Sequence, residues 1–393
     1  MAPIRLALIG LSSSAKTAWA SKAHLPYLLS EKGKSKYTIV ALLNSSVAAA
    51  KDAIAAYDLP STVKAYGDPA ALAADPDVDL VVCTTRVDKH YLTSFPSIEA
   101  GKDTFIEWPL AQDAHHARFL TEKAKEKGIK TLVALQGPLG PLPEKLREVL
   151  VSGRIGKVLS SEVRAFGGIN SRDSIPEGLK YFTDLKIGGN YFHIQLGHLS
   201  DFLQSVLGEA TPLGAPLLQI QRPSLKVTAD SSGAVLETVT SNTPDLIAFN
   251  ATLSESSYVA KGASLGVRLR RGQAYPGDPA LVWNIHGEKG EIRIVSPTTT
   301  LITIGSPTDP QEFEIHDFES DKVEKIEWKF EDWQEELPYP ARNIAAIYEQ
   351  FYEEKTGGKI PGEGETKARY ASFEHALKRH EQLEGLLKGA GFL

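Results

Sequence analysis

A glycine and several serines follow the first apolar segment of the chain, and these residue types can hold a phosphate. The segment Ile4–Ile9 ends at Gly10, and a short serine-rich loop leads from there into a helical pattern. Free N–H groups and the helix dipole at such a junction favour a pyrophosphate. Serine is small, and its hydroxyl can donate to a phosphate oxygen. We expect the pyrophosphate of a dinucleotide at Gly10, Ser12, Ser13 and Ser14; the alternative is a plain strand–helix turn.

The second expected strand, Tyr37–Leu43, ends at neutral polar residues. Asn44, Ser45 and Ser46 stand where an NAD-selecting domain often carries the carboxylate that binds the ribose 2′-OH. Neutral donors tolerate a 2′-phosphate, whereas asparagine can also bond a free ribose. We therefore expect these residues to bind NADP or NAD, with NADP favoured.

Four further polar residues lie at or after the end of the apolar run Val78–Thr84, at the carboxyl edge of the expected sheet. Ligands of α/β sheets bind at this edge. We expect a cofactor contact there from Thr84, Thr85, Arg86 and His90. For Arg86, a contact with a phosphate and a surface ion pair are equally open.

The elements that position these residues alternate between strand and helix through residue 135. Buried strands are expected at Ile4–Ile9, Tyr37–Leu43, Val78–Thr84, Thr104–Ile106 and Lys130–Leu135, with helical segments between them, among them Lys16–Leu29. This α/β pattern predicts a Rossmann domain with a doubly wound parallel sheet over residues 1–137.

After Gly137 longer strand-like segments dominate, for example Val158–Phe166, Leu265–Arg270 and Leu301–Ile304, with a helix expected at Tyr191–Val206. We expect residues 138–393 to form an α+β substrate and dimerisation domain with a large, mostly antiparallel open sheet.

Composition narrows the class of protein. The net charge of -6 gives no support for direct binding of nucleic acid or an anionic membrane. Cys83 is the only cysteine, so no internal disulfide forms, and we expect no metal site. The sequence carries neither a Gly-x-Ser-x-Gly nor a His-Glu-x-x-His motif, so hydrolysis by a serine or metal route has no support.

A set of motifs then resembles a known family. The motifs are Gly10 after the first strand, His24-Leu25-Pro26, Asp79–Thr84, His90, Ala100-Gly101-Lys102, Glu107-Trp108-Pro109-Leu110, Gly188-Gly189-Asn190, Gly197-His198-Leu199-Ser200-Asp201 and His286-Gly287-Glu288-Lys289-Gly290-Glu291. In order and spacing the chain resembles the glucose–fructose oxidoreductase / inositol dehydrogenase (Gfo/Idh/MocA) family along nearly its whole length. The serine-rich loop with Trp19-Ala20, Asn44-Ser45, Trp108 and Lys180-Tyr181 is most similar to the fungal galactose-regulon repressor branch.

The resemblance implies that Glu107, Trp108 and Pro109 close the cofactor cleft, with a cis bond before Pro109. It also reveals two departures. Enzymes of the family usually carry lysine where Trp108 stands, and aspartate where Ile194 stands. Tryptophan donates only through its indole N–H and carries no charge. The family's active-site histidine is retained as His198.

His198 is therefore the candidate acid/base residue. An imidazole titrates near neutrality, which suits proton exchange with a carbinol. We expect Tyr191 or Tyr181 to assist and Asp201 to orient the ring. The alternative is a structural histidine, or one that binds a sugar without reacting.

The sequence thus favours a cytoplasmic, dimeric NAD(P)-dependent oxidoreductase that moves hydride to or from a sugar-like or other small polar alcohol, carbonyl or imine. A nicotinamide-assisted glycoside cleavage stays open. The alternative function is a non-catalytic, NAD(P)-binding transcriptional regulator with a protein partner, in the cytoplasm or the nucleus.

Overall fold

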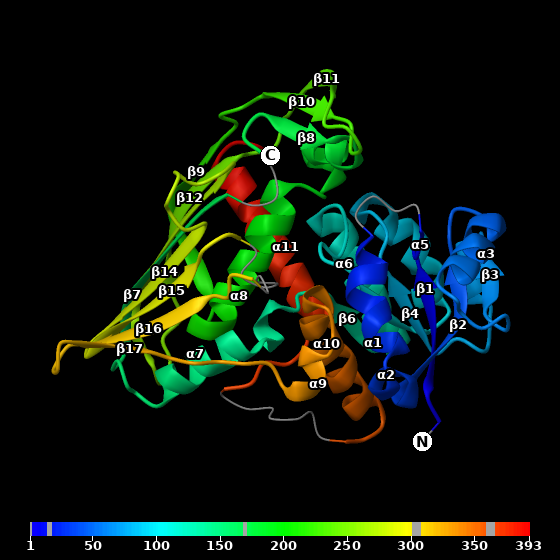
Figure 1. Cartoon of the computed structure of the whole chain (residues 1–393), viewed down its shortest axis with the longest axis horizontal. Helices are drawn as coiled ribbons and strands as arrows, with labels where there is room; N and C mark the ends of the chain where they lie inside the picture. The colour runs from blue at the N-terminus through cyan, green and yellow to red at the C-terminus, as the bar shows by residue number, and fades with distance from the viewer. Residues whose placement is uncertain (1, 14–17, 168–170, 301–307, 359–365) are drawn as a thin grey trace.

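The N-terminal domain is a parallel sheet with helices on both faces, in a computed structural model that describes residues 2–13, 18–167, 171–300, 308–358 and 366–393 (Figure 1). Its described strands are β1 (Ile4–Ile9), β2 (Tyr37–Leu43), β3 (Lys64–Tyr66), β4 (Leu80–Cys83), β5 (Asp103–Ile106) and β6 (Thr131–Val133). The order β3-β2-β1-β4-β5-β6 confirms the doubly wound Rossmann sheet. The direction of winding reverses between β1 and β4, so a ligand crevice is expected at their carboxyl ends.

Local signals set the ends of the helices in this domain. Ser46 accepts a hydrogen bond from the Ala49 N–H at the start of α3, and Asp113 accepts one from the His116 N–H at the start of α6. Gly128 ends α6 with φ of +66°. The helices are α1 (Leu25–Leu29), α2 (Glu31–Lys36), α3 (Val47–Ala56), α4 (Pro69–Ala73), α5 (Val87–Glu99) and α6 (Ala114–Lys127), with a short π-helix η1 (Ala20–His24) before α1.

The second domain is built on a large sheet in the order β17-β16-β15-β14-β7-β13-β12-β9. Among the described strands of this large sheet only β7 and β13 pair in parallel, which confirms the mostly antiparallel sheet. The strands are β7 (Val158–Gly167), β9 (Ala210–Gln219), β12 (Leu246–Leu253), β13 (Val259–Arg271), β14 (Leu281–Gly287), β15 (Gly290–Ser296), β16 (Glu312–Asp317) and β17 (Lys322–Lys325). A smaller sheet joins β8 (Ser174–Pro176), β10 (Ser224–Thr228) and β11 (Val235–Thr240).

Helices lie between the large sheet and the Rossmann domain (Figure 1). They are α7 (Pro141–Val151), the π-helix η5 (Tyr191–Leu196) that runs directly into α8 (Gly197–Leu207), and α11 (Phe373–Gly389). Strand residues alternate between this buried side and an outer face, as in β14, where Trp283 and Ile285 are buried. The core therefore lies on the side of the sheet that faces the first domain.

The end of the chain returns to the N-terminal domain. Helix α10 (Tyr339–Lys355), which follows the short α9 (Asp332–Glu335), joins the hydrophobic cluster of β1 and β2. There the Tyr37 hydroxyl donates to the Tyr348 carbonyl at 2.6 Å. The boundary at residue 137 stays a prediction, and α10 lies beyond it in the sequence but packs on the first sheet.

Some expected elements differ from those observed. The strand expected at Leu301–Ile304 and part of the helix expected over Lys16–Leu29 lie outside the described residues; the described part of that helix begins as η1. The strands β9, β10 and β11 were not predicted. Nearly all of β9 and β11 is exposed, so these strands carry no apolar alternation to reveal them.

Among the described residues, no helix combines the length and the apolar character needed to cross a membrane.

Candidate functional site

The loop after β1 meets the loop after β4 at the carboxyl edge of the Rossmann sheet. The Gly10 N–H donates to the Leu43 carbonyl at 3.0 Å, and φ of Gly10 is +95°. A Cβ on Gly10 would lie 2.8 Å from Cγ2 of Thr85, so this position needs glycine for both backbone conformation and space. Ser12 is half-buried and Ser13 exposed, whereas Ser14 lies outside the described residues. The close approach of Gly10 to Thr85 is consistent with a loop whose backbone can bind a pyrophosphate.

The residues after β4 are tied to both neighbouring loops. Thr84 donates through Oγ1 and through its N–H to the Ile9 carbonyl, at 2.8 and 2.9 Å. His90 is buried, and its ring nitrogens lie 2.8 Å from the Thr85 carbonyl oxygen and 2.9 Å from that of Pro109. Burial lowers the pKa of His90 below its ordinary value. His90 thus links the loop after β4 to the segment after β5, and its contact with a cofactor stays a prediction.

Arg86 pairs within its own loop. Its Nε and Nη2 donate to the two carboxylate oxygens of Asp88 at 2.5 and 2.6 Å. Its guanidinium lies 5.2 Å from the centre of the Tyr181 ring, a cation–π distance that links the two domains. Of the two alternatives for Arg86, the structure therefore contains the ion pair.

Asn44 uses both of its amide hydrogens inside the protein. Nδ2 donates to the Leu11 carbonyl at 2.8 Å and to the Ala49 carbonyl at 3.1 Å. Because two carbonyl acceptors face Nδ2, Oδ1 must be the outer atom of the amide. Ser45 and Ser46 beside it are exposed. Asn44 therefore offers a ligand an acceptor and no donor.

Glu107 is anchored to a buried histidine that sequence reasoning did not assign. Its Oε1 lies 2.6 Å from His24 Nε2, and His24 Nδ1 lies 2.9 Å from the Tyr348 hydroxyl. His24 is fully buried, and the Glu107 side chain is 12% exposed. The His24-Leu25-Pro26 motif had marked this histidine only as part of the resemblance. Helix α10 positions Tyr348 beside His24, and this contact could be seen only in the structure.

Trp108 lies in a packed site between the domains. The peptide bond before Pro109 is cis, as expected. The indole Nε1 donates to the His193 carbonyl at 3.0 Å, and the ring centre lies 4.8 Å from that of His380. A Cβ on Gly197 would lie 2.5 Å from this ring. Trp108 is 5% exposed, so its side chain fills the domain interface instead of presenting a polar group to a ligand.

The histidines around Trp108 are neutral at physiological pH. Burial lowers the pKa of His193 to about 4, and that of His380 to about 3. Neither imidazole can supply the charge that the family's lysine would carry.

His198 differs from these histidines because it is partly exposed. Its Nδ1 is buried and has no hydrogen-bond partner among the described residues. Burial lowers its pKa below the ordinary 6.5, and the charges of Glu107 and Asp201 offset part of that effect. At neutral pH the imidazole is therefore uncharged and able to accept a proton.

The expectation that Asp201 orients His198 is wrong. Asp201 Oδ1 lies 2.5 Å from His375 Nε2 and accepts from Arg379 Nε at 3.0 Å. Both partners come from α11, which the spacing within α8 cannot reveal. Ile194, at the family's aspartate position, adds no polar group.

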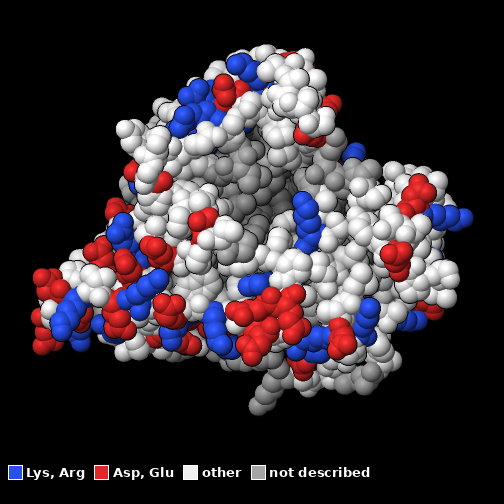
Figure 2. Space-filling model, viewed as in Figure 1, with Lys and Arg blue, Asp and Glu red and all other residues white. Residues whose placement is uncertain are grey.

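The structure separates the two tyrosines that were expected to assist. The Tyr181 ring lies against Gly189, where a Cβ would be 3.0 Å from Cε2, and next to Arg86. Tyr191 is buried and lines a different pocket, whose lining does not include His198. Tyr181 therefore stays the candidate partner for a ligand at the domain interface. Figure 2 shows the hollow between the two domains.

Comparisons with known proteins agree with this two-domain arrangement. A family described as "Oxidoreductase family, NAD-binding Rossmann fold" matches residues 4–135, and one described as "Gal80p, C-terminal domain" matches residues 141–296. Dehydrogenase aclE of Aspergillus oryzae is 30% identical over 303 residues, which cover 77% of this chain and 79% of that protein. The galactose/lactose metabolism regulatory protein GAL80 of Saccharomyces cerevisiae is 25% identical over 305 residues, 75% of this chain and 67% of that protein.

Solved structures share the fold over the whole chain. A super-repressor mutant of Gal80p from Saccharomyces cerevisiae has a TM-score of 0.85 at 22% identity and covers 100% of this chain and 96% of its own. A levoglucosan dehydrogenase in complex with NADH and L-sorbose has a TM-score of 0.73 at 16% identity and covers 100% of this chain and 98% of its own.

Fold and site together define a two-domain protein built around a dinucleotide-binding Rossmann sheet. The chain belongs to the Gfo/Idh/MocA oxidoreductase family, and its second domain is of the Gal80p type.

Proposed function

We propose that the protein is an NAD-dependent oxidoreductase that moves a hydride to or from a carbon bearing oxygen on a sugar-like or other small polar substrate. The observation that carries this proposal is the state of His198. It is partly exposed, it has a ring nitrogen without a partner among the described residues, and its pKa lies below the ordinary 6.5. A neutral imidazole in this setting is suited to take the proton of a carbinol.

The remaining residues of the site would bind and orient the cofactor and the substrate. A bound nicotinamide would supply or accept the hydride. The loop from Gly10 to Ser13 would hold the pyrophosphate, and Thr85 lies so close to Gly10 that a side chain at this position has no room. Tyr181 would pack against the substrate side, where Arg86 supports its ring.

Asn44 supports NAD as the preferred cofactor. Both Nδ2 hydrogens are used by backbone carbonyls, so Oδ1 can accept from a ribose 2′-OH. A 2′-phosphate would place negative charge beside this acceptor, and the first cation that follows in the sequence is Lys51, an exposed residue of α3. These hydrogen bonds argue against the NADP preference expected from the neutral residues after β2. A dissociation constant lower for NADP than for NAD, measured by calorimetry, would contradict the NAD proposal.

The oxidoreductase proposal is tested by turnover. The wild-type protein is incubated with NAD or NADH and a panel of sugars, polyols, ketones and imines, and the reduced nicotinamide band is followed. His198→Asn should lower turnover by roughly 10²–10⁴ with little change in NAD affinity. His115→Asn, an exposed histidine at the start of α6, is the matched control. Unchanged turnover in His198→Asn would remove the catalytic assignment.

A second candidate is a cofactor-gated regulator, and Trp108 is the observation that favours it. The family's lysine and aspartate are replaced by Trp108 and Ile194, and the Trp108 ring is committed to packing. A protein that binds NAD but shows no turnover on any member of the panel would support this candidate. GAL80 is described as a regulatory protein, and the similarity of this chain to GAL80 supports the regulator as the second candidate.

We further propose that the protein forms a homodimer through the outer face of its large sheet. Charged and amide side chains stand on that face beside exposed leucines, for example Arg164, Arg268 and Asn250 with Leu213 and Leu217. Light scattering coupled to size exclusion tests this: a monomeric mass at micromolar concentration would contradict it.

A further inference from the structure

Glu107 lies at the end of a chain of hydrogen bonds that begins on helix α10. It directly follows β5, and its N–H donates to the Cys83 carbonyl of β4 at 3.0 Å. Its Oε1 lies 2.6 Å from Nε2 of His24, whose Nδ1 lies 2.9 Å from the Tyr348 hydroxyl. Segments from both ends of the chain thus meet at one carboxylate on the carboxyl edge of the Rossmann sheet.

The partners of these groups determine where the protons lie. Burial raises the pKa of Tyr348, and the charge of Glu107 raises it further, so the hydroxyl keeps its proton. Among the described residues the hydroxyl has one hydrogen-bond partner, Nδ1 of His24, and it therefore donates to that nitrogen. A neutral imidazole that accepts at Nδ1 carries its proton on Nε2. His24 therefore donates to Glu107, which accepts as a carboxylate.

The two residues behind the carboxylate are shielded from water. His24 and Tyr348 are both fully buried. The rings of Tyr27, Tyr37 and Phe105 pack around them, with centres 5.4, 5.2 and 5.3 Å from that of the Tyr348 ring. Water therefore cannot replace either hydrogen bond, and the loss of one weakens the whole chain of bonds.

The other oxygen of Glu107 remains available to the site. Oε2 has no hydrogen-bond partner among the described residues, and the side chain is 12% exposed. Burial lowers the pKa of His198, and the charge of Glu107 is the larger of two charges that oppose this effect. When His198 accepts a proton, this carboxylate therefore stabilises the imidazolium that forms.

Another histidine close to Glu107 is already committed to the protein. The charge of Glu107 also reaches His90, but the ring nitrogens of His90 bond to the Thr85 and Pro109 carbonyls. Nδ1 of His198 has no partner among the described residues. His198 is therefore the histidine whose proton exchange Glu107 can assist.

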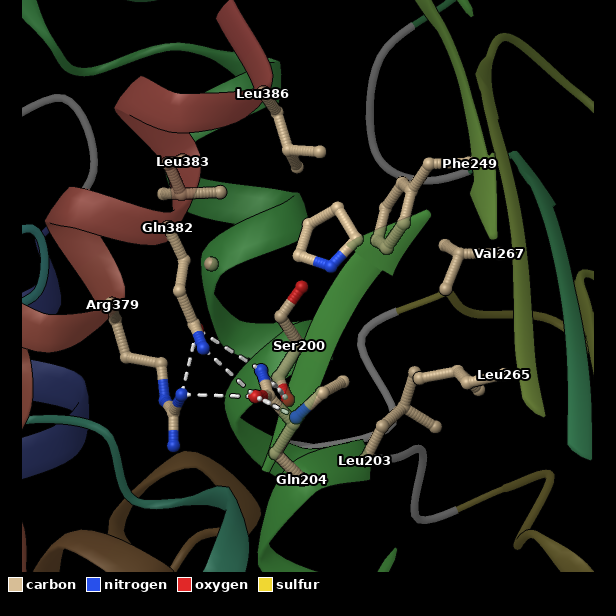
Figure 3. A pocket seen from close by; sticks show the side chains of 13 residues that line it. Ser200, Leu203, Gln204, Phe249, Leu265, Val267, Arg379, Gln382, Leu383 and Leu386 are labelled. Carbon is tan, nitrogen blue, oxygen red and sulfur yellow. Dashed lines mark hydrogen bonds between the residues drawn. The ribbon is translucent and has the colours of Figure 1, made fainter. Parts of the chain in front are cut away.

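Helix α8, which carries His198, is held by α11 through a second polar network (Figure 3). Arg379 donates to Asp201 at 3.0 Å and to Gln204 at 3.1 Å, and Gln382 also donates to Gln204. The cavity beside these side chains measures about 30 Å³, which leaves room for about one water. Both His198 and Glu107 are therefore held in place by buried hydrogen bonds.

We propose that His24 and Tyr348 are positioning residues that hold Glu107 in one orientation as an ionised carboxylate, so that its charge stabilises the protonated form of His198. This inference rests on the proposed oxidoreductase function, in which His198 takes the proton of a carbinol. His24 and Tyr348 act through Glu107 and need no contact with substrate or cofactor.

Nuclear magnetic resonance of the full chain with isotope-labelled histidine tests this arrangement without any turnover. His24 should show the Nε2–H tautomer at neutral pH. His198 should titrate at a lower pH in Glu107→Gln than in the wild type, because a charge that favours the imidazolium is lost. The matched control is Tyr27→Phe, which removes a buried hydroxyl that bonds to Glu349 and not to His24. It should leave both observations unchanged.

Steady-state kinetics with NAD and a substrate from the turnover panel test the effect on the reaction. His24→Met removes the donor to Glu107, whereas His24→Gln has a similar length and keeps an N–H donor. We expect kcat to fall by about 10-fold in His24→Met with little change in KM, and His24→Gln to recover most of this loss. Tyr348→Phe should lower kcat by about 3- to 10-fold, and Tyr27→Phe should not.

Several results would overturn the proposal. They are a wild-type His24 in the Nδ1–H or the doubly protonated form at neutral pH, an unchanged titration of His198 in Glu107→Gln, or equally slow His24→Gln and His24→Met. Tyr348→Phe keeps the packed ring, so an unchanged kcat in this variant decides against the proposal even if His24→Met does not fold. A wild-type protein without turnover would contradict the oxidoreductase function, whereas the resonance measurements would still test how Glu107 is held.

Discussion

Replacement of Trp108 tests whether this residue is a structural member of the domain interface. Trp108→Phe removes the indole N–H that donates to the His193 carbonyl at 3.0 Å and keeps an aromatic ring against Gly197 and His380. Loss of a buried hydrogen-bond partner costs about 1–3 kcal/mol of unfolding free energy. Trp108→Lys removes the ring itself from a site that is 5% exposed. Removal of a buried aromatic costs about 3–5 kcal/mol.

The assay is urea denaturation followed by far-ultraviolet circular dichroism, with turnover measured on the same preparations. We expect the order wild type, Trp108→Phe, Trp108→Lys in unfolding free energy, and no gain in turnover from the lysine. Trp333→Phe is the control, because that indole bonds to Glu331 at the surface and its loss should cost less than about 1 kcal/mol.

One outcome would refute this view of Trp108. If Trp108→Lys were as stable as the wild type and raised turnover, the position would face the reacting atoms, as in the family's lysine enzymes. The packing of the Trp108 indole against Gly197 would then not be the arrangement of the catalytically active protein.

Three further predictions follow from single residues. Gly10→Ala should weaken NAD binding by about 10-fold in calorimetry, since φ of +95° and the 2.8 Å approach to Thr85 leave no room for a Cβ; wild-type affinity would contradict it. Asn44→Asp should also weaken NAD, by about 10-fold, because both amide donors are lost and a carboxylate faces two carbonyl oxygens; tighter NAD binding would count against the assigned amide orientation. Asp201→Asn should lower the unfolding free energy at pH 7 by about 1–3 kcal/mol, because it removes the charge that pairs with His375 and Arg379, while Arg379 keeps its pair with Glu209. Burial opposes ionisation of Asp201, but His375 and Arg379 outweigh it and keep its pKa below 3.8, so its contribution is complete above that pH and is lost as pH falls through the lowered value. The gap between variant and wild type in acid denaturation should therefore close toward low pH, and a gap independent of pH would contradict this.

Much of the fold could be predicted from the sequence because the Rossmann strands are short, apolar and ended by turn residues. β2 matches its expected range of Tyr37–Leu43, and β1 ends at Gly10 as expected. Strand β11 of the small sheet could not be predicted in this way, because it is almost entirely exposed and lacks the alternation that a half-buried strand shows. Its neighbour β10 does alternate, with Leu225 and Val227 buried, but this five-residue pattern was missed.

The candidate site was only partly predictable, because its chemistry depends on contacts between distant segments. The family resemblance implied that Trp108 helps to close the cofactor cleft, but the packing partners His380 and Gly197 come from α11 and α8. Asp201 was expected to serve His198, yet its partners lie 174 and 178 positions along the chain. Asn44 was correctly placed at the end of β2, but only the structure shows that its donors are used.

The pH dependence of kcat/KM for alcohol oxidation tests the role of His198 most directly. Its pKa lies below 6.5, so the neutral, proton-accepting form predominates at neutral pH. The wild-type protein should keep full activity at neutral pH and lose it only as pH falls below 6.5 through the lowered pKa. His198→Asn should show a low rate without this acidic limb and should bind NAD as the wild type does. If His198→Asn kept the wild-type rate and the same loss of activity at acidic pH, the assignment of His198 as the proton-exchanging residue would be contradicted.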